Sequence, residues 1–122
     1  MIDRRVVNIF QPDVMYMGGL TRILKLANLI SQAGFVCTPH AANLSLVTVC
    51  TMHLLKAIPN AGKYLEFSIE GEDYYPWQQD LFSNHPFEIK EGKVIIPDEP
   101  GWGVVINEDW LNSSEYEISE LN

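Results

Sequence analysis

The segment Phe35-Val36-Cys37-Thr38-Pro39-His40 decides the fold of this chain. Its first four residues are apolar or β-branched and Pro39 ends the run, which is typical of a short buried strand. His40 follows two residues after Thr38, just past the end of that strand. In parallel α/β proteins, reactive side chains lie in the loops that follow the carboxyl ends of strands. The segment therefore predicts an α/β fold with an ionisable imidazole at a strand end.

The residues on either side of this segment predict alternating strands and helices. Residues 6–10 form a β-branched and aromatic run, and residues 64–67 form a third short strand. Between the strands, residues 20–33 and 45–57 repeat apolar side chains at helical spacing, and Gly34 ends the first helix. The expected buried face of the second helix comprises Leu46, Val47, Cys50 and Leu54. Connections of this length are typical of parallel βαβ units.

The chain changes character after Ser68. Residues 69–87 are rich in acids, aromatic residues and proline, which predicts a long loop. Three short elements are expected beyond it: a β-hairpin of residues 87–90 and 93–96 around Glu91-Gly92, a strand at 104–106, and a helix that Asn107 caps and that continues to Trp110. We therefore divide the chain into residues 1–68 and residues 69–122.

Composition places the chain among globular proteins and argues against a membrane span and against nucleic acid as a partner. Of the 122 residues, 47% are apolar and 20% charged, and no apolar run reaches the roughly 18 residues of a membrane span. No signal-peptide core follows Met1, so we expect a cytoplasmic protein in which Cys37 and Cys50 are reduced core thiols. Residues 1–65 hold six basic and two acidic side chains, whereas residues 66–122 hold two basic and fourteen acidic ones. The net charge of −8 argues against nucleic acid as a partner.

Three ionisable side chains fall at equivalent strand ends. Asp13 lies two residues past Gln11, His40 follows the second strand, and Glu66 lies in the third strand or at its end. The chain from Asp13 to His40 makes one complete helix-and-return unit, which places these two residues on adjacent strands. A carboxylate beside an imidazole selects one ring tautomer and stabilises the protonated ring, as general acid–base chemistry requires. We therefore expect Asp13, His40 and Glu66 to converge at one end of the sheet.

Each of these residues also has a purely structural interpretation. His40 could bond a backbone carbonyl, Asp13 could cap a turn, and Glu66 could lie on a solvated face. The other two histidines are expected to be structural, with His53 packed or exposed on the second helix and His85 on the surface. The first half of the sequence holds no cluster of metal-ligating residues at ligand spacing.

Several motifs spread along the chain occur together in one known family. They are Ile9-Phe10-Gln11-Pro12-Asp13-Val14, Met17-Gly18-Gly19-Leu20-Thr21, Ala33-Gly34 before the strand that ends Pro39-His40, His53-Leu54-Leu55, Ala57-Ile58-Pro59-Asn60, Leu65-Glu66, Val94-Ile95-Ile96-Pro97 and Pro100-Gly101-Trp102-Gly103-Val104. With these motifs the chain resembles the C-terminal part of the enolase superfamily over nearly all of residues 6–110. It is similar to the mandelate racemase subgroup of the mandelate racemase and muconate lactonizing enzyme family, which has an Asp after the sixth barrel strand, a His after the seventh and a Glu at the eighth. The muconate-lactonising subgroup would show a lysine near Asp13, and this sequence has none there.

The resemblance implies a particular architecture. Residues 1–68 would form strands six to eight of a TIM-type (β/α) barrel, and residues 69–122 a C-terminal tail whose β-hairpin packs on a capping domain. The chain would then be a C-terminal fragment that is inactive alone and that associates with the rest of the barrel or with another copy.

The resemblance also implies a reaction. His40 would be the general base or acid at the carbon next to a substrate carboxylate, Asp13 its partner, and Glu66 a hydrogen-bond partner of that carboxylate. Mg²⁺ is the implied cofactor, with its ligands in the missing N-terminal part. The implied substrate is a small-molecule carboxylate, and an acid-sugar dehydratase is the first interpretation, with a racemase, epimerase or cycloisomerase as the alternative. A catalytically inactive interaction module is the alternative from another class.

Overall fold

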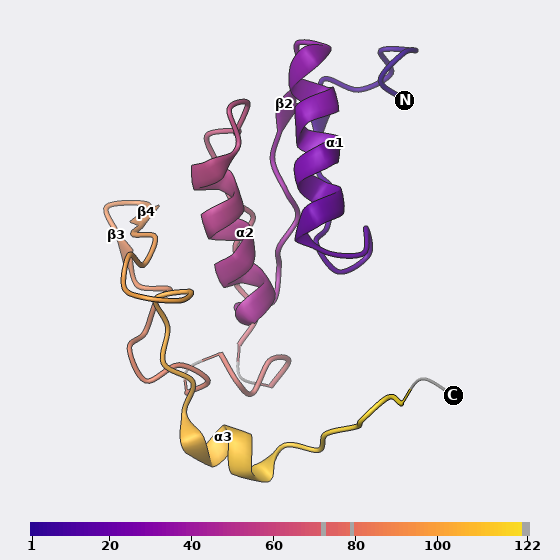
Figure 1. Cartoon of the computed structure of the whole chain (residues 1–122). Helices are drawn as coiled ribbons and strands as arrows, with labels where there is room; N and C mark the ends of the chain where they lie inside the picture. The colour runs from indigo at the N-terminus through magenta and orange to yellow at the C-terminus, as the bar shows by residue number, and fades with distance from the viewer. Residues whose placement is uncertain (72, 79, 121–122) are drawn as a thin grey trace.

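Two parallel strands, each followed by a helix, form the first half of the molecule. The computed structural model describes residues 1–71, 73–78 and 80–120. The elements of this half are β1 (Ile9–Phe10), α1 (Leu20–Gln32), β2 (Val36–Cys37) and α2 (Leu46–Ala57). Strands β1 and β2 pair in parallel, and α1 lies against β2 (Figure 1). The order confirms the predicted α/β arrangement, although the first strand is shorter than residues 6–10.

One face of the strand pair packs on the core and the other is open. The register pairs Ile9 with Val36 and Phe10 with Cys37. Cys37 is fully buried, whereas Ile9 and Val36 are 56% and 38% exposed. Because side chains alternate across a strand, Phe10 and Cys37 face the core, and the two aliphatic side chains lie on the opposite face. The core cluster includes Val14, Ile23, Ala27, Ile30, Cys37, Leu54 and Ile58.

Local sequence determines where the two helices begin and end. Gly34, at φ 78°, adopts the left-handed conformation that commonly terminates a helix, and its N–H donates to the carbonyl oxygen of Ser31. Helix α2 begins after Ser45, whose hydroxyl accepts a hydrogen bond from the N–H of Val47. Both helix predictions are therefore confirmed to within a residue or so at each end.

The predicted buried face of α2 is wrong in most of its members. The buried residues are Thr48, Val49, Thr51, Met52 and Leu54, whereas Leu46 is exposed and Val47 and Cys50 are half-buried. Helix α2 is apolar around most of its circumference, so its sequence pattern does not select one face. The C-terminal part of the chain also covers this helix, since the ring of Trp102 packs edge-on against His53.

Both cysteines are free thiols, and they differ in burial. Cys37 is buried in the core and Cys50 is half-buried. Burial raises the pKa of both thiols, which disfavours the reactive thiolate. The expectation of a core thiol is thus confirmed for Cys37, and Cys50 lies at the edge of the core.

The third strand, predicted at residues 64–67, does not form. A single parallel bridge joins Cys37 to Ala61 instead, with the N–H of Cys37 donating to Asn60 O and the N–H of Gly62 donating to Cys37 O, both at 2.9 Å. The next donor on this side of β2 would be residue 39, which is a proline and has no N–H. The pairing therefore ends at Gly62, and the chain leaves β2 before it reaches residue 64.

The second half contains a hairpin around the predicted turn, with strands shorter than the predicted residues 87–90 and 93–96, and a short helix after Asn107. Strands β3 (Ile89–Lys90) and β4 (Lys93–Val94) pair antiparallel. Glu91 and Gly92 between them have φ values of 51° and 72°, as a two-residue turn that matches strand twist requires. Helix α3 (Glu108–Ser113) follows Asn107, whose side chain accepts a hydrogen bond from the N–H of Asp109. The helix ends three residues beyond the predicted end at Trp110.

The strand predicted at residues 104–106 is wrong. Within residues 1–71, 73–78 and 80–120, one antiparallel bridge, between Phe82 and Ile106, is present there. The described residues around Phe82 form turns and bends, which do not continue this bridge into a ladder. The division of the chain at residue 68 stays a prediction.

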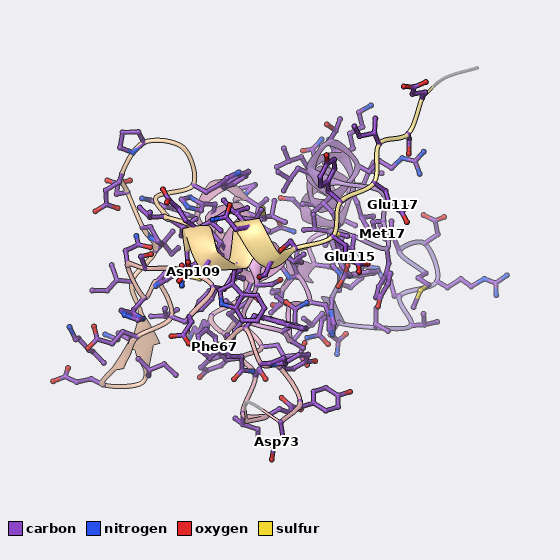
Figure 2. All side chains as sticks on the ribbon, turned by 90° about the horizontal axis from the view of Figure 1, so that it is seen from below. Met17, Phe67, Asp73, Asp109, Glu115 and Glu117 are labelled. Atoms are coloured by element: carbon purple, nitrogen blue, oxygen red, sulfur yellow. The ribbon has the colours of Figure 1, made fainter. Side chains whose placement is uncertain are left out.

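The C-terminal part contacts α2 through polar side chains as well. Lys56 Nζ lies 3.0 Å from Asp98 Oδ1, and His53 Nε2 lies 3.0 Å from the carbonyl oxygen of Trp102. Beyond α3 the chain is extended, and Figure 2 shows Glu115 and Glu117 along this segment. Across the described part of the chain, no helix combines the length and the apolar character that a membrane span needs.

Replacing Gly62 by alanine is expected to destabilise the fold. A Cβ atom at this position would meet Thr38 Oγ1 at 1.9 Å, so either the Thr38 side chain or the bridge between Cys37 and Ala61 has to shift. Overpacking of this kind costs about 1–3 kcal/mol in free energy of unfolding. Urea unfolding measures it, with Gly71→Ala as the matched control because a Cβ there meets nothing within 4 Å. Equal midpoints for the two variants would contradict the close approach.

Candidate active site

Asp13 and His40 lie side by side at the same end of the strand pair. They form a parallel bridge that continues the register of β1 and β2 by three residues, and the N–H of His40 donates to Pro12 O at 3.0 Å. The backbone therefore places both side chains at the carboxyl ends of adjacent parallel strands. This is the location at which parallel α/β proteins collect their reactive groups.

The carboxylate of Asp13 is fully engaged in hydrogen bonds. Its Oδ2 lies 2.8 Å from His40 Nδ1, and its Oδ1 accepts from the N–H groups of Met15 at 2.7 Å and Tyr16 at 3.0 Å. Burial opposes ionisation of Asp13, but the hydrogen bonds from His40, Tyr16 and Met15 outweigh it and hold the pKa of Asp13 below its ordinary value of 3.8. Asp13 thus closes a turn and also pairs with the imidazole of His40, whereas a catalytic role of this pair stays a prediction.

The lowered pKa of Asp13 predicts a specific loss of stability in acid. A carboxyl group with a lower pKa in the folded state stabilises the fold at pH values above its unfolded pKa, and this contribution is lost as the pH falls through the folded pKa. Urea unfolding of the wild type between pH 7 and pH 2 is expected to show this loss. Asp13→Asn is expected to show a smaller pH dependence, whereas Asp3→Asn, at an exposed site, serves as the control. Identical pH dependence in Asp13→Asn and the wild type would contradict the hydrogen-bond assignment.

The other ring nitrogen of His40 faces Glu66. His40 Nε2 lies 3.3 Å from Glu66 Oε2, and the side chains of His40 and Glu66 are 41% and 44% exposed, against 13% for Asp13. The imidazole is therefore held from its buried side and accessible on the side of Nε2. The predicted convergence of the three side chains is confirmed, although Glu66 reaches the site from an irregular segment and not from a strand.

The remaining histidines lie apart from this group. His53 contacts the carbonyl oxygen and the ring of Trp102, and His85 is exposed at a positive φ of 46°. Both therefore have the structural positions that the sequence predicts.

Sequence reasoning gave no role to Asn43, which organises the loop after His40. Its Oδ1 accepts from Ser45 Oγ at 2.7 Å and from the N–H of Ser45 at 3.3 Å. An asparagine two residues before a helix cap is a common turn-forming residue, so the signal was present in the sequence.

The described residues do not form a magnesium site. Among residues 1–71, 73–78 and 80–120, no group of three or more His, Cys, Asp and Glu side chains could hold a metal ion. Both oxygens of Asp13 are already occupied by hydrogen bonds. Mg²⁺ prefers near-octahedral oxygen coordination, which this set does not supply.

The fold and the site together define a class of protein. The chain is an α/β structure with a carboxylate–imidazole pair at the ends of adjacent parallel strands and a second carboxylate across the open ring nitrogen. Residues 1–110 match the model of the family described as enolase C-terminal domain-like, the family of the mandelate racemase and muconate lactonizing enzymes. The chain belongs to this family, and so to the enolase superfamily.

Relatives within the family are enzymes of several types. D-gluconate dehydratase from Thermoproteus tenax is 30% identical over 95% of this chain and 22% of its own length. Other relatives are named as an arabinonate dehydratase, a D-galactarolactone cycloisomerase and an epimerase. The chain thus spans between a fifth and a third of the length of the relatives it matches.

Two solved structures show the similarity in three dimensions. A protein from Roseobacter denitrificans, provisionally named a racemase, is 58% identical over 99% of this chain and 33% of its own, with a TM-score of 0.90. L-talarate dehydratase from Polaromonas sp. JS666, complexed with Mg and L-glucarate, is 29% identical over 94% of this chain and 28% of its own, with a TM-score of 0.64. The enolase-type α/β fold of this chain is therefore established.

Proposed function

We propose that the chain forms part of a magnesium-dependent enzyme that removes the proton next to a substrate carboxylate, and that this enzyme is an acid-sugar dehydratase. The observation that carries the proposal is the Asp13–His40 pair, with Nδ1 of the ring bound at 2.8 Å and Nε2 directed toward Glu66 at 3.3 Å in a half-exposed position. When a substrate replaces the Glu66 contact, an imidazole held in this way can accept or donate a proton at Nε2, which is the requirement for general acid–base catalysis.

Dehydration of an acid sugar breaks two bonds in the substrate. The C2–H bond gives its proton to a base, and the C3–O bond breaks as the hydroxyl group leaves with a proton as water. The resulting enol becomes a 2-keto acid. His40 Nε2 takes or returns a proton in this sequence, and Asp13 stabilises the ring while it carries the positive charge.

Glu66 is the proposed partner of the substrate carboxylate. In the structure its carboxylate lies 3.3 Å from His40 Nε2, in the space in front of the proton-transferring atom. A substrate that binds here replaces this contact and lies between Glu66 and His40. Glu66 in its protonated form would donate a hydrogen bond to the substrate carboxylate and so orient the adjacent carbon toward Nε2.

Magnesium enters the proposal through relatives and not through this site. The talarate dehydratase was solved with Mg, and the described residues of this chain offer no ligand set for it. When bound in enzymes of this type, the ion supplies electrostatic stabilisation of negative charge on the substrate carboxylate. We propose that its ligands come from other parts of the complete enzyme.

Association of this chain with further barrel structure belongs to the same proposal. Ile9 and Val36 leave an apolar face of the strand pair exposed, and the outer edge of β1 has no strand beside it among the described residues. Exposed edges and apolar sheet faces are normally covered in native proteins. The remainder of a (β/α) barrel, or a second copy, would cover both.

A racemase is the second candidate. The specific observation that favours it is the 58% identity to the Roseobacter denitrificans protein, which is provisionally named a racemase. Proton removal next to a carboxylate is common to both reactions, so His40, Asp13 and Glu66 would keep their roles. The difference lies in whether the proton returns to the carbon or a neighbouring hydroxyl group leaves.

One experiment separates these functions. The full-length enzyme is incubated in D₂O with Mg²⁺ and a panel of acid sugars that includes D-gluconate and L-glucarate. A dehydratase releases a 2-keto acid, whereas a racemase or epimerase leaves deuterated substrate with inverted configuration at C2. Absence of both 2-keto acid formation and deuterium exchange with every acid sugar, together with absence of Mg²⁺ binding by calorimetry, would contradict the enzyme and favour an interaction module.

A further inference from the structure

We propose that two aromatic side chains from the C-terminal part of the chain, Trp77 and Phe87, position the catalytic groups. Trp77 holds the loop that follows His40, and Phe87 holds the segment that carries Glu66. The inference rests on the proposed function, because it assumes that His40 and Glu66 act on a substrate. Neither aromatic residue touches the reacting atoms, so both are positioning residues.

The first link runs from Trp77 to the loop after His40. The indole N–H of Trp77 donates to the carbonyl oxygen of Asn43 at 3.0 Å. The side chain of Asn43 in turn accepts from Ser45 and from Thr48 Oγ1, the latter at 3.4 Å, and so connects the loop to the start of α2. Trp77 lies 34 residues further along the chain than Asn43, so it anchors this loop from a distant part of the sequence.

The loop also needs an external contact because one of its residues has an uncommon conformation. Leu44 has a φ of 47° and is only 8% exposed. A leucine in the left-handed region persists only where surrounding contacts compensate for its cost. Leu44 lines a cavity of about 370 Å³ together with Phe82 and Phe87. The same C-terminal part therefore faces the loop across this cavity.

The second link runs from Phe87 to the segment that carries Glu66. Within the described residues, the main chain of residues 64–68 makes no backbone–backbone hydrogen bond. Side chains hold the segment instead. The rings of Phe67 and Phe87 meet edge-to-face with centroids 6.0 Å apart, and Gln78 Nε2 donates to Ser68 Oγ at 3.0 Å. Phe87 packs in turn on Phe82, at 5.7 Å, and Phe82 is 3% exposed. Figure 2 shows Phe67 among the side chains in the middle of the molecule.

The two links predict different kinetic effects. Displacing the loop after His40 moves the proton-transferring group, and a misplacement of about 1 Å can lower a rate on the order of 10²-fold. Displacing Phe67 moves Glu66, which is proposed to bind the substrate carboxylate. Loss of the Trp77 link should therefore lower kcat, and loss of the Phe87 link should raise KM.

Trp77→Phe tests the first link in the full-length enzyme. The substitution keeps an aromatic ring and removes the N–H donor to Asn43. With D-gluconate or L-glucarate in D₂O, kcat for 2-keto acid formation, or for exchange at C2 in the case of a racemase, is expected to fall on the order of 10-fold while KM changes less than about twofold. The matched control is Trp102→Phe, because the indole of Trp102 packs on His53 and not on the site loop. This control is expected to keep wild-type kinetics.

Phe87→Ala tests the second link. Its KM for the same acid sugars is expected to rise on the order of 10-fold, and Phe87→Tyr is expected to restore it, because a tyrosine ring keeps the edge contact with Phe67. Phe35→Ala is the matched control, since Phe35 packs on Phe10 at the opposite end of the strand pair. A purely structural role of Phe87 would give the same kinetics in both alanine variants.

A measurement that needs no substrate separates the positioning role of the aromatic residues from the proposed catalytic function. The ring signals of His40 are followed by NMR in histidine-labelled enzyme and are assigned by their loss in His40→Asn. Trp77→Phe is expected to shift the His40 signals, and Trp102→Phe those of His53. If both positioning variants leave the His40 signals and the kinetics as in the wild type, the inference is overturned. If the wild type exchanges no acid sugar but Trp77→Phe still shifts the His40 signals, the positioning role stands and the proposed function fails.

Discussion

Replacing His40 by asparagine in the full-length enzyme is expected to abolish most of the proton exchange at the carbon next to the substrate carboxylate. Asparagine is close in size to histidine and cannot carry a proton between substrate and solvent near neutral pH. Removal of a positioned acid–base group commonly lowers the rate by about 10²–10⁴. The rate is measured by mass spectrometry in D₂O as formation of the 2-keto acid, which takes its solvent deuterium at C3, together with deuterium incorporation at C2 of the recovered substrate.

His53→Asn is the matched control for this experiment. His53 lies on α2 and contacts the carbonyl oxygen of Trp102. It is not part of the hydrogen-bonded group of Asp13, His40 and Glu66. It is expected to exchange the same proton at a rate close to that of the wild type. Continued exchange by His40→Asn at the wild-type rate would show that His40 is not the catalyst.

Replacing Asp13 by asparagine is the second change with a large expected effect. In the structure Oδ1 of Asp13 accepts from the N–H groups of Met15 and Tyr16, and Oδ2 faces His40 Nδ1. The carbonyl oxygen of an asparagine would stay on the two N–H donors, because only oxygen can accept there. Its NH₂ group would then face His40 Nδ1 and donate to it.

The consequence is the wrong ring tautomer. A ring whose Nδ1 accepts a hydrogen bond carries its proton on Nε2, so Nε2 can no longer take a proton from the substrate. Asp→Asn at the equivalent position of catalytic triads drops kcat about 10⁴-fold for this reason, and we expect a loss on the order of 10²–10⁴ here. Exchange kinetics give the rate, and ¹⁵N spectra of His40 report the tautomer.

A structural role of Asp13 alone gives a different result. If Asp13 only closes the turn at Met15 and Tyr16, the asparagine variant should lose about 1 kcal/mol of stability and keep its exchange rate. Asp98→Asn is the control, because Asp98 also pairs with a charged side chain, Lys56, but at an exposed site. A normal exchange rate in Asp13→Asn would rule out the catalytic pair.

Local sequence predicted the elements whose ends depend on nearby residues. The stop at Gly34, the cap at Ser45 and the cap at Asn107 each act within a few residues of the helix that they bound. The turn at Glu91-Gly92 likewise determines the hairpin from two residues. These features are visible in the sequence because the interactions that stabilise them are short in range.

The elements that were predicted wrongly depend on partners distant in the chain. The strand expected at residues 64–67 needs a neighbour with free donors, and Pro39 removes the next one on β2. Among the described residues, the strand expected at residues 104–106 is reduced to a single bridge, between Ile106 and Phe82. The buried face of α2 depends on which segments cover an almost uniformly apolar helix, which periodicity alone does not decide.

The sequence by itself determined that Asp13 and His40 would meet, because both follow short strands joined by one helix and parallel strands align their carboxyl ends. Only the tertiary structure decided how Glu66 joins them. Residues 64–68 have no ladder to hold them within the described chain, so the position of Glu66 depends on packing between Phe67 and Phe87. Strand pairing follows from backbone geometry and a local pattern, whereas this contact joins residues 20 positions apart through side chains whose fit no local pattern encodes.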